Sequence, residues 1–269
     1  MKTITKIATQ QKAKNRFNIY LDDEYAFSVS EDVLIKYHLH KGLELSDDEI
    51  ETIMQADNFH RFYTMALHYL SYRMRSEREM RNYLSEKDVS EEIVHEIIEK
   101  LKKEKLLNDK DFANAFVQDR ILHTSKGPTL IAQELKKKGI RDEIIQEVLK
   151  NYTYELQLEK VTKLAEKFLH RKSKHSHQKR FEQLKLRLIQ SGFSQEIINN
   201  VISDMKEEFT IDHEAEYEKL EVQADKLYRK YSKKYSGFEL IQKLKEGLFR
   251  RGFEVELINK YIEKLEEEL

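Results

Sequence analysis

The residues that could do chemistry in this chain are clustered cations, and their chemistry would be the binding of an acidic or anionic partner. One group lies where a helix is predicted to begin and consists of Arg73, Arg75, Arg78 and Arg81. Interleaved glutamates could pair with these arginines, although such pairs on a helix surface contribute only about 0.2–0.5 kcal/mol each. A solvated helix face and a partner-binding face are therefore equally good interpretations.

Two other groups of cations are candidates for the same chemistry. Arg120 and Lys126 bracket a loop ahead of a helix predicted to start at Gly127-Pro128, and a helix N-terminus attracts anions. These two favour partner binding. A longer basic run spans residues 167–187, and its candidates are Lys172, Lys174, Lys179 and Arg180. The run could contact a nucleic acid or an acidic surface, but the sequence favours a solvated basic loop.

Other possible sites are weaker. His170, His175 and His177 lie in the basic run, but a metal site is not expected because two of them fall in a Ser/Lys-rich loop without a carboxylate ligand. Tyrosines and lysines alternate near residues 226–235 and could stack bases, but at helical spacing Tyr228 and Tyr231 are better interpreted as core. No phosphate-binding glycine loop or nucleophile elbow is present, so we expect no enzyme activity and no cofactor.

Composition indicates a helical, heavily charged protein. Of 269 residues, 36% are charged and one is proline, and the formal net charge of −1 argues against a general polyanion binder. The absence of cysteine fits a reducing compartment. No stretch resembles a secretory signal or a membrane span, so we expect a cytoplasmic protein without membrane contact.

One helical pattern of apolar residues occurs four times. In its first copy, Met80 and Leu84 precede a pivot at Asp88, and Ile93 and Ile97 follow it. Spacings of four residues are helical. The other copies have their pivots at Gly139, Gly192 and Gly252, at separations of 51, 53 and 60 residues. A period of this size predicts an array of helical units.

Each copy is preceded by a further apolar helical segment, so each unit should contain three helices. A glycine at a helix end followed by an apolar residue is a typical C-cap, and an aspartate can take the same left-handed geometry at modest cost. We predict a mostly α fold, an elongated array of tandem three-helix repeats with a small N-terminal β-hairpin/α module. The predicted boundaries are 1–57 for the module and 58–107, 108–153, 154–210 and 211–269 for the repeats.

The N-terminal module has the alternating pattern of strands. Runs at residues 4–7, 16–20 and 25–29 predict a three-stranded antiparallel sheet with an Asp-rich turn. Ser30 should cap a helix that ends near Leu39, and a Ser46–Glu49 capping box should open a helix that ends near Ala56.

Three segments resemble signatures of the RecX family. Residues 73–84 resemble R-x-R-S-x-x-E-L-x-x-x-L, residues 107–120 resemble L-[ND]-D-x-x-[FY]-A-x-x-[FW]-[VI]-x-x-R, and residues 126–140 resemble K-G-P-x-x-I-x-x-E-L-x-x-K-G-I. Met80 departs from the usual leucine and Asp88 from the glycine of the other pivots. The third and fourth repeats carry few signature residues.

The resemblance implies a non-enzymatic regulator that binds the RecA–single-stranded-DNA filament. It implies inhibition of ATP hydrolysis, strand exchange and filament persistence, and thereby tuning of recombination, DNA repair and the SOS response. It also favours a role for Arg73, Arg75 and Glu79, including pairing between repeats. The expected partner is the RecA filament, with DNA as a direct second partner, and the expected oligomeric state is a monomer.

A helical-repeat DNA-binding protein of the helix-turn-helix type is the alternative. Its recognition helix should present basic and amide residues to the DNA. The third helices of the first and last repeats, at residues 90–103 and 253–269, are acid-rich instead, which disfavours docking beside phosphates.

Overall fold

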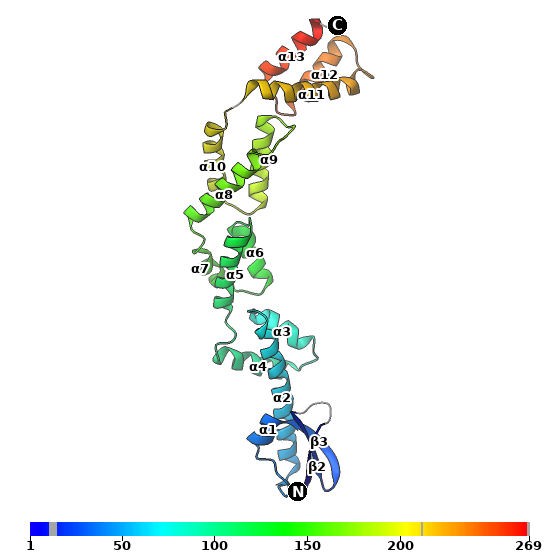
Figure 1. Ribbon diagram of the computed structural model, residues 1–269, viewed down its shortest axis with the longest axis vertical. Coiled ribbons are helices and arrows are strands. Elements are labelled where there is room, and N and C mark those ends of the chain that lie inside the picture. Colours follow the sequence, from blue (N-terminus) through cyan, green and yellow to red (C-terminus); the bar gives the residue numbers. More distant parts are fainter. Residues whose placement is uncertain (11–14, 211, 268–269) are drawn as a thin grey trace. The chain divides into compact units, whose positions relative to one another are not determined.

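The computed structural model describes residues 1–10, 15–210 and 212–267. The chain divides into two compact units. Figure 1 labels the helices and strands along the chain. The first comprises Met1–Asn114 with Lys136–Ile144, and the second comprises Ala115–Leu135 with Ile145–Leu269. The second repeat, with α5 (Asp109–His123), α6 (Pro128–Lys137) and α7 (Asp142–Leu149), contributes residues to both units.

The chain starts with an antiparallel sheet in the strand order β3-β2-β1-β4. Its strands are β1 (Lys2–Thr9), β2 (Arg16–Leu21), β3 (Glu24–Ser30) and β4 (Glu44–Leu45). The prediction of three strands was incomplete, because the two residues of β4 are too few to show alternation. Ile4, Ile19 and Val29 have no exposed surface and form the core of this module.

Two helices pack on the sheet. Ser30 caps α1 (Glu31–Lys36) by accepting a hydrogen bond from the Val33 amide. The helix ends at Lys36, before the predicted Leu39, and His38 just beyond it takes a left-handed φ of 50°. The second helix, α2 (Asp47–Ser71), opens with the predicted capping box of Ser46 and Glu49.

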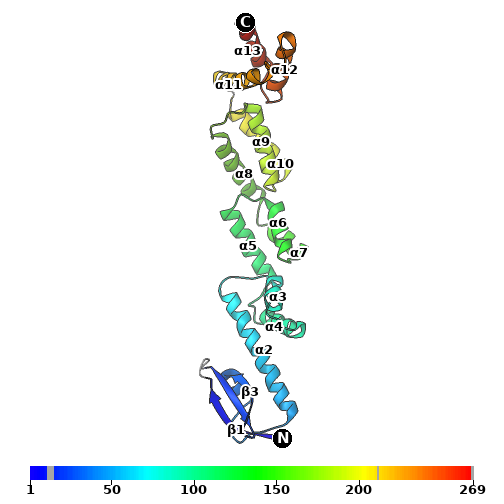
Figure 2. The same cartoon turned by 90° about the vertical axis from the view of Figure 1, so that its right-hand side faces the viewer.

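Helix α2 is one continuous helix, so the expected end near Ala56 was wrong. No glycine or proline follows Ala56 to interrupt it, and the helix runs from the sheet into the first repeat (Figure 2). Its first half contributes Ile53 to the core of the sheet, and its second half contributes Phe62 and Ala66 to the core of the repeat. The module and the first repeat therefore share a helix.

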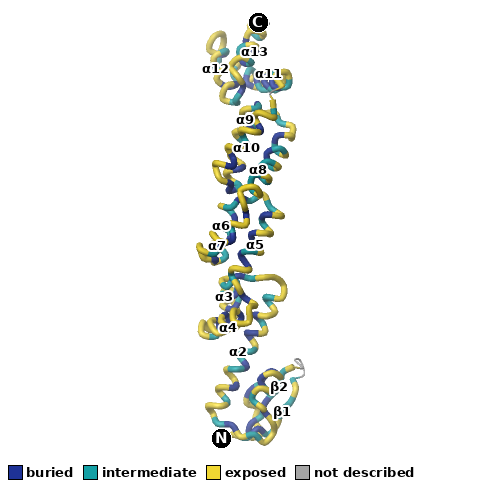
Figure 3. Tube along the Cα trace, turned by 90° about the vertical axis from the view of Figure 1, so that its left-hand side faces the viewer, coloured by how far each residue is buried: buried dark blue, intermediate teal, exposed yellow. Residues whose placement is uncertain are grey.

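The repeats are built from amphipathic helices whose buried faces meet, as the burial pattern shows (Figure 3). The first repeat continues with α3 (Glu77–Ser85) and α4 (Glu91–Lys103). In the second unit, one set contains α8 (Tyr154–Leu169), α9 (His177–Gln190) and α10 (Gln195–Glu208), and the last contains α11 (His213–Tyr231), α12 (Gly237–Phe249) and α13 (Val255–Glu267). This arrangement is the predicted three-helix pattern.

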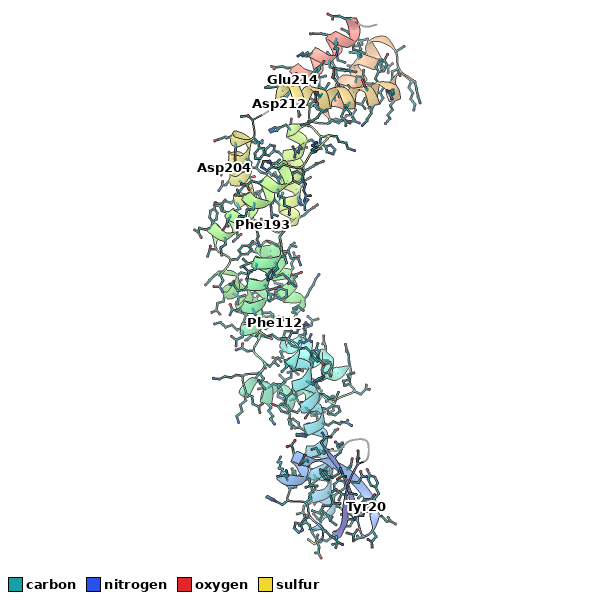
Figure 4. All side chains as sticks on the ribbon, in the orientation of Figure 1. Tyr20, Phe112, Phe193, Asp204, Asp212 and Glu214 are labelled. Atoms are coloured by element: carbon teal, nitrogen blue, oxygen red, sulfur yellow. The ribbon has the colours of Figure 1, made fainter. Side chains whose placement is uncertain are left out.

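Pivots and caps separate these helices. The left-handed φ angles at the four pivots are 56° at Asp88, 82° at Gly139, 85° at Gly192 and 81° at Gly252. The apolar residue after a pivot is buried, as at Phe193, which packs edge-to-face on Tyr152 at 6.5 Å between ring centroids (Figure 4). Turning helices at these points lets consecutive amphipathic faces close on one core.

A buried ion pair holds the module to α2 and generates a first prediction. Asp57, 7% exposed, accepts hydrogen bonds from Arg16 and from the Ser30 amide, each at 2.7 Å. Asp57→Ala should destabilise this module by about 2–3 kcal/mol, because the Ser30 amide loses its acceptor and the Arg16 guanidinium loses its carboxylate partner. Faster hydrogen exchange of the β3 amides would show it.

The matched control is Asp47→Ala, which removes an exposed pair with Lys2 at 3.0 Å on the same helix. It should change the free energy of opening by less than about 1 kcal/mol. Equal effects of the two substitutions would contradict the assigned role of Asp57.

Candidate partner-binding surface

The start of α3 docks on the pivot of the second repeat. Ser76 is fully buried, and its hydroxyl donates to the Lys138 carbonyl at 2.7 Å while accepting from the Glu79 amide at 3.2 Å. A Cβ atom on Gly139 would lie 2.6 Å from the Cβ of Arg78. Glycine is therefore required by this close approach as well as by its φ.

The same joint occurs between the last two repeats. Ser176 is fully buried, donates to the Arg251 carbonyl at 2.7 Å and accepts from the Lys179 amide at 3.2 Å. A Cβ atom on Gly252 would lie 2.8 Å from the Ser176 hydroxyl oxygen. We call each such contact, between the start of a repeat's second helix and the pivot of the next repeat, a repeat joint.

The middle repeat joint is held by hydrogen bonds between backbone atoms. The amide of Gly127 donates to the Ser191 carbonyl at 2.7 Å, and the amide of Thr129 donates to the Gly192 carbonyl at 3.2 Å. A Cβ atom on Gly192 would lie 2.8 Å from the Leu130 amide nitrogen. Here a glycine, Gly127, replaces the capping serine, and a Cβ atom on it would clash with the Gly192 carbonyl oxygen.

A carboxylate from the next repeat completes the first and third joints. Asp109 accepts from the Glu77 amide at 2.8 Å, and Glu216, 5% exposed, accepts from the His177 amide at 2.6 Å. Burial raises the pKa of the Asp109 carboxyl. In the middle joint this helix position is Pro128, which has no N–H to satisfy.

The first pivot differs because no helix start docks on it. Lys87 and Asp88 are exposed, and within the described residues no helix start donates to the Lys87 carbonyl. The helix starts that confront Gly139, Gly192 and Gly252 therefore have no counterpart at this pivot in the described part of the chain. This explains why an aspartate is accommodated here alone.

Two of the residues singled out in the sequence, Arg73 and Glu79, belong to the first joint. Arg73 pairs with Glu79 at 3.1 Å, and Lys138 of the second repeat reaches the same carboxylate at 2.6 Å. Burial by itself would raise the pKa of Glu79, but the hydrogen bonds from Arg73 and Lys138 lower it to about 2. Arg73, in the first repeat, thus stabilises the joint through its ion pair with Glu79.

The neighbouring arginines have different surroundings. The Arg75 guanidinium lies 3.9 Å from the ring centroid of Tyr69, which stacks on Tyr83 at 4.0 Å. Arg81 pairs with two glutamates, Glu77 at 2.9 Å and Glu91 at 3.3 Å, whereas Arg78 is exposed. The tyrosine stack was not predicted because its rings come from separate helices and share no spacing rule.

Arg120 and Lys126 converge on one carboxylate. Arg120 pairs with Glu134 at 2.9 Å, and the Lys126 ammonium contacts the other oxygen of the same group. Although burial opposes the effect, these two cations lower the pKa of Glu134. The structure thus brings Arg120 and Lys126 together on Glu134. Glu134 lies in the same signature segment as Lys126, residues 126–140.

The basic run divides into fixed and exposed cations. The Arg180 guanidinium donates to the carbonyls of Phe168 at 3.1 Å and Arg171 at 2.7 Å, which caps the end of α8, and burial lowers its pKa. Lys179 pairs with Glu182 at 2.8 Å. The loop before α9 leaves two cations exposed, Lys172 and Lys174.

The tyrosines near residues 226–235 and the possible metal site are the remaining candidates. Tyr228 and Tyr231 pack against the core of the last repeat, as expected. Across the ranges 1–10, 15–210 and 212–267, no group of three or more His, Cys, Asp or Glu residues could hold a metal ion. No helix in this described part of the chain is long and apolar enough to cross a membrane.

A glycine comparison tests the repeat joint. Gly192→Ala should destabilise the second unit by about 2–4 kcal/mol, because left-handed strain of about 1–2 kcal/mol adds to an overpacked contact with Leu130. Urea unfolding followed by circular dichroism would measure the loss. Gly237→Ala is the control, since Gly237 also has positive φ but a Cβ atom there would meet nothing within 4 Å. If Gly237→Ala lowered the free energy of unfolding as much as Gly192→Ala, the close-approach argument would be refuted.

The Glu79 network predicts a pH dependence. Because its folded pKa is about 2 and its ordinary value is 4.5, Glu79 stabilises the fold above about pH 4.5. This contribution should be lost as the pH falls from 4.5 towards 2. Melting temperatures measured over this range should fall less steeply for Glu79→Gln, while Glu96→Gln, at an exposed glutamate of α4, should follow the parent curve.

Comparisons with known proteins agree with this architecture. Four family models match, the regulatory protein RecX N-terminal domain at residues 2–46 and the first, second and third RecX three-helix domains at 63–101, 108–149 and 214–262. The regulatory protein RecX of Oceanobacillus iheyensis is 49% identical over 98% of both chains, and that of Bacillus subtilis is 40% identical over 99% of this chain and 100% of its own.

Solved structures give the same result. A crystal structure of regulatory protein RecX matches with a TM-score of 0.65 and 38% identity, over 75% of this chain and 98% of that one. RecX from Lactobacillus salivarius matches with a TM-score of 0.53 and 39% identity, over 55% of this chain and 97% of that one. With four domains matched in order and relatives that cover it almost completely, the chain belongs to the RecX family of regulatory proteins.

Proposed function

We propose that this protein regulates the RecA recombinase by binding the RecA–single-stranded-DNA filament. It reduces ATP hydrolysis, strand exchange and filament persistence, and it does so as a monomer in the cytoplasm without catalysing a reaction. The observation that carries the proposal is the similarity, along nearly the whole chain, to proteins named regulatory protein RecX. The signature segments between residues 73 and 140 support the same assignment.

The tandem construction suits a partner made of repeated subunits. The first and last repeats each have a buried core, and the joints at Ser76 and Ser176 link consecutive repeats through directional hydrogen bonds. Several weak contacts to successive protomers of a filament would then add up to strong binding, without any single strong site.

The candidate residues take two roles in this proposal. Arg78, Lys172 and Lys174 are exposed and would contact acidic groups of the filament directly. The other cations hold the surface in shape through ion pairs, hydrogen bonds or ring contacts; they are Arg73, Arg75, Arg81, Arg120, Lys126, Lys179 and Arg180. A helix-turn-helix interpretation is disfavoured because α4 begins with Glu91 and Glu92.

A titration of RecA ATPase activity on single-stranded DNA tests the proposal. Substoichiometric amounts of the protein should inhibit hydrolysis. Arg78→Glu should raise the concentration needed for half-inhibition several-fold, because a surface cation at the contact becomes an anion. Lys103→Glu, at an exposed position of α4, is the matched control. Unchanged hydrolysis at a molar excess of the protein would rule out the proposed function.

A further inference from the structure

The third repeat joint contains a hollow of about 400 Å³. Its walls come from the loop before α9, the first turn of α9, one side chain of α11 and the turn after α12. The lining residues are Lys174, His175, Ser176, Lys179, Gln223, Arg250, Arg251 and Phe253. Lys174 and Lys179 belong to the basic run of residues 167–187, whereas the two arginines lie some 75 residues further along the chain.

The hollow is cationic. Four of its lining residues are lysine or arginine, and none is a carboxylate. Glu182 and Glu246 pair with Lys179 at 2.8 Å and Arg250 at 3.6 Å, and Glu216 accepts a hydrogen bond from the His177 amide, but none of these three carboxylates lines the hollow. Such exposed pairs contribute little. An anion entering the hollow would therefore meet several donors of positive charge from different segments of the chain.

The first repeat joint shows that this charge is not needed to hold two repeats together. The residue three positions after the capping serine is Glu79 in the first joint and Lys179 in the third. Glu79 is held by two cations. The serine hydroxyl makes the same 2.7 Å bond to a carbonyl in both. The two joints share the hydrogen bonds of the serine hydroxyl, while the charge at this cap position is reversed.

The backbone donors at the start of α9 are already used. The Lys179 amide donates to Ser176 and the His177 amide donates to Glu216. Attraction for an anion must therefore come from the side chains. Lys174 and Arg250 are the two most available, because Lys174 lies in the exposed loop and the Arg250 side chain is 70% exposed.

A second hollow, of about 470 Å³, adjoins the first and shares Lys174 and His175 with it. It adds Lys172 and Ser173. Two adjoining cationic hollows form a path with room for successive charges, which suits a linear polyanion better than a single small anion. The backbone of single-stranded nucleic acid has this form, and basic grooves that follow it bind with strong salt dependence.

We propose that these two hollows form a phosphate-binding track for the backbone of single-stranded DNA. The track lies between the segment matched to the third RecX three-helix domain and residues 150–213, which are outside the four matched segments. It is thus a property of the third repeat and its joint. It gives the chain a direct contact with DNA that does not depend on a recombinase.

The test is binding of a fluorescent 20-nucleotide oligothymidylate to the full chain, followed by anisotropy over a series of salt concentrations and without any recombinase. The double variant Lys174→Gln/Arg250→Gln should bind on the order of tenfold more weakly at low salt. Its salt slope should fall by about 1.4, because each lost phosphate contact on a single strand contributes about 0.7. Lys174→Arg/Arg250→Lys, which keeps both charges, should restore binding.

The matched control is Lys233→Gln/Lys234→Gln, two exposed lysines that line neither hollow. It should lose clearly less affinity than the first double variant. Equal losses in both, or an unchanged slope in the first, would overturn the proposal. So would displacement of the oligonucleotide by polyglutamate at equal charge concentration, because the track would then accept acidic polypeptides as readily as phosphates. None of these outcomes bears on RecA inhibition, so the two proposals fail separately.

Discussion

The structure depends on a hydrogen-bonded contact between the start of one helix and the end of another. In each repeat joint the incoming helix reaches the carbonyl or the glycine of a pivot, at 2.7 Å in its shortest bond. The approach leaves no room for a Cβ atom at Gly139, Gly192 or Gly252. Helix ends carry unpaired amides and carbonyls, and the joint satisfies both kinds at once.

This constraint explains much of the charge pattern. Asp109 and Glu216 are placed to accept a first-turn amide, and Glu79 is held at a joint by cations from two repeats. Several cations that look like a binding surface in the sequence are engaged with the protein itself. The few that remain exposed, such as Arg78 and Lys174, are those on which a partner could act without competing with an internal bond.

Periodicity was sufficient to predict the helices, because a stripe of apolar residues reflects a local requirement for one buried face. It also located the pivots, where the stripe is interrupted by Asp88 or by a glycine. It could not show that α2 continues past Ala56, since a helix shared by two cores has no local signal at the point of transfer. The joints were equally out of reach, because Ser76 and Lys138 are 62 residues apart and Ser176 and Arg251 are 75 apart.

The candidate site was harder to predict than the fold for a related reason. A run of cations has the same appearance whether its members cap a helix, as Arg180 does, or face solvent, as Lys172 does. The contacts seen in the folded structure are needed to tell a helix-capping cation from a solvent-exposed one. Because the joints share the serine cap, a difference between them is informative. Where Glu79 in the first joint is replaced by Lys179 in the third, the bond from the residue's amide to the serine hydroxyl is unchanged at 3.2 Å, but the charge is reversed and the bond from the Ser76 amide to the Glu79 carboxylate has no counterpart. Recognition in a tandem-repeat protein is then expected at the joints whose chemistry departs from the common structural pattern.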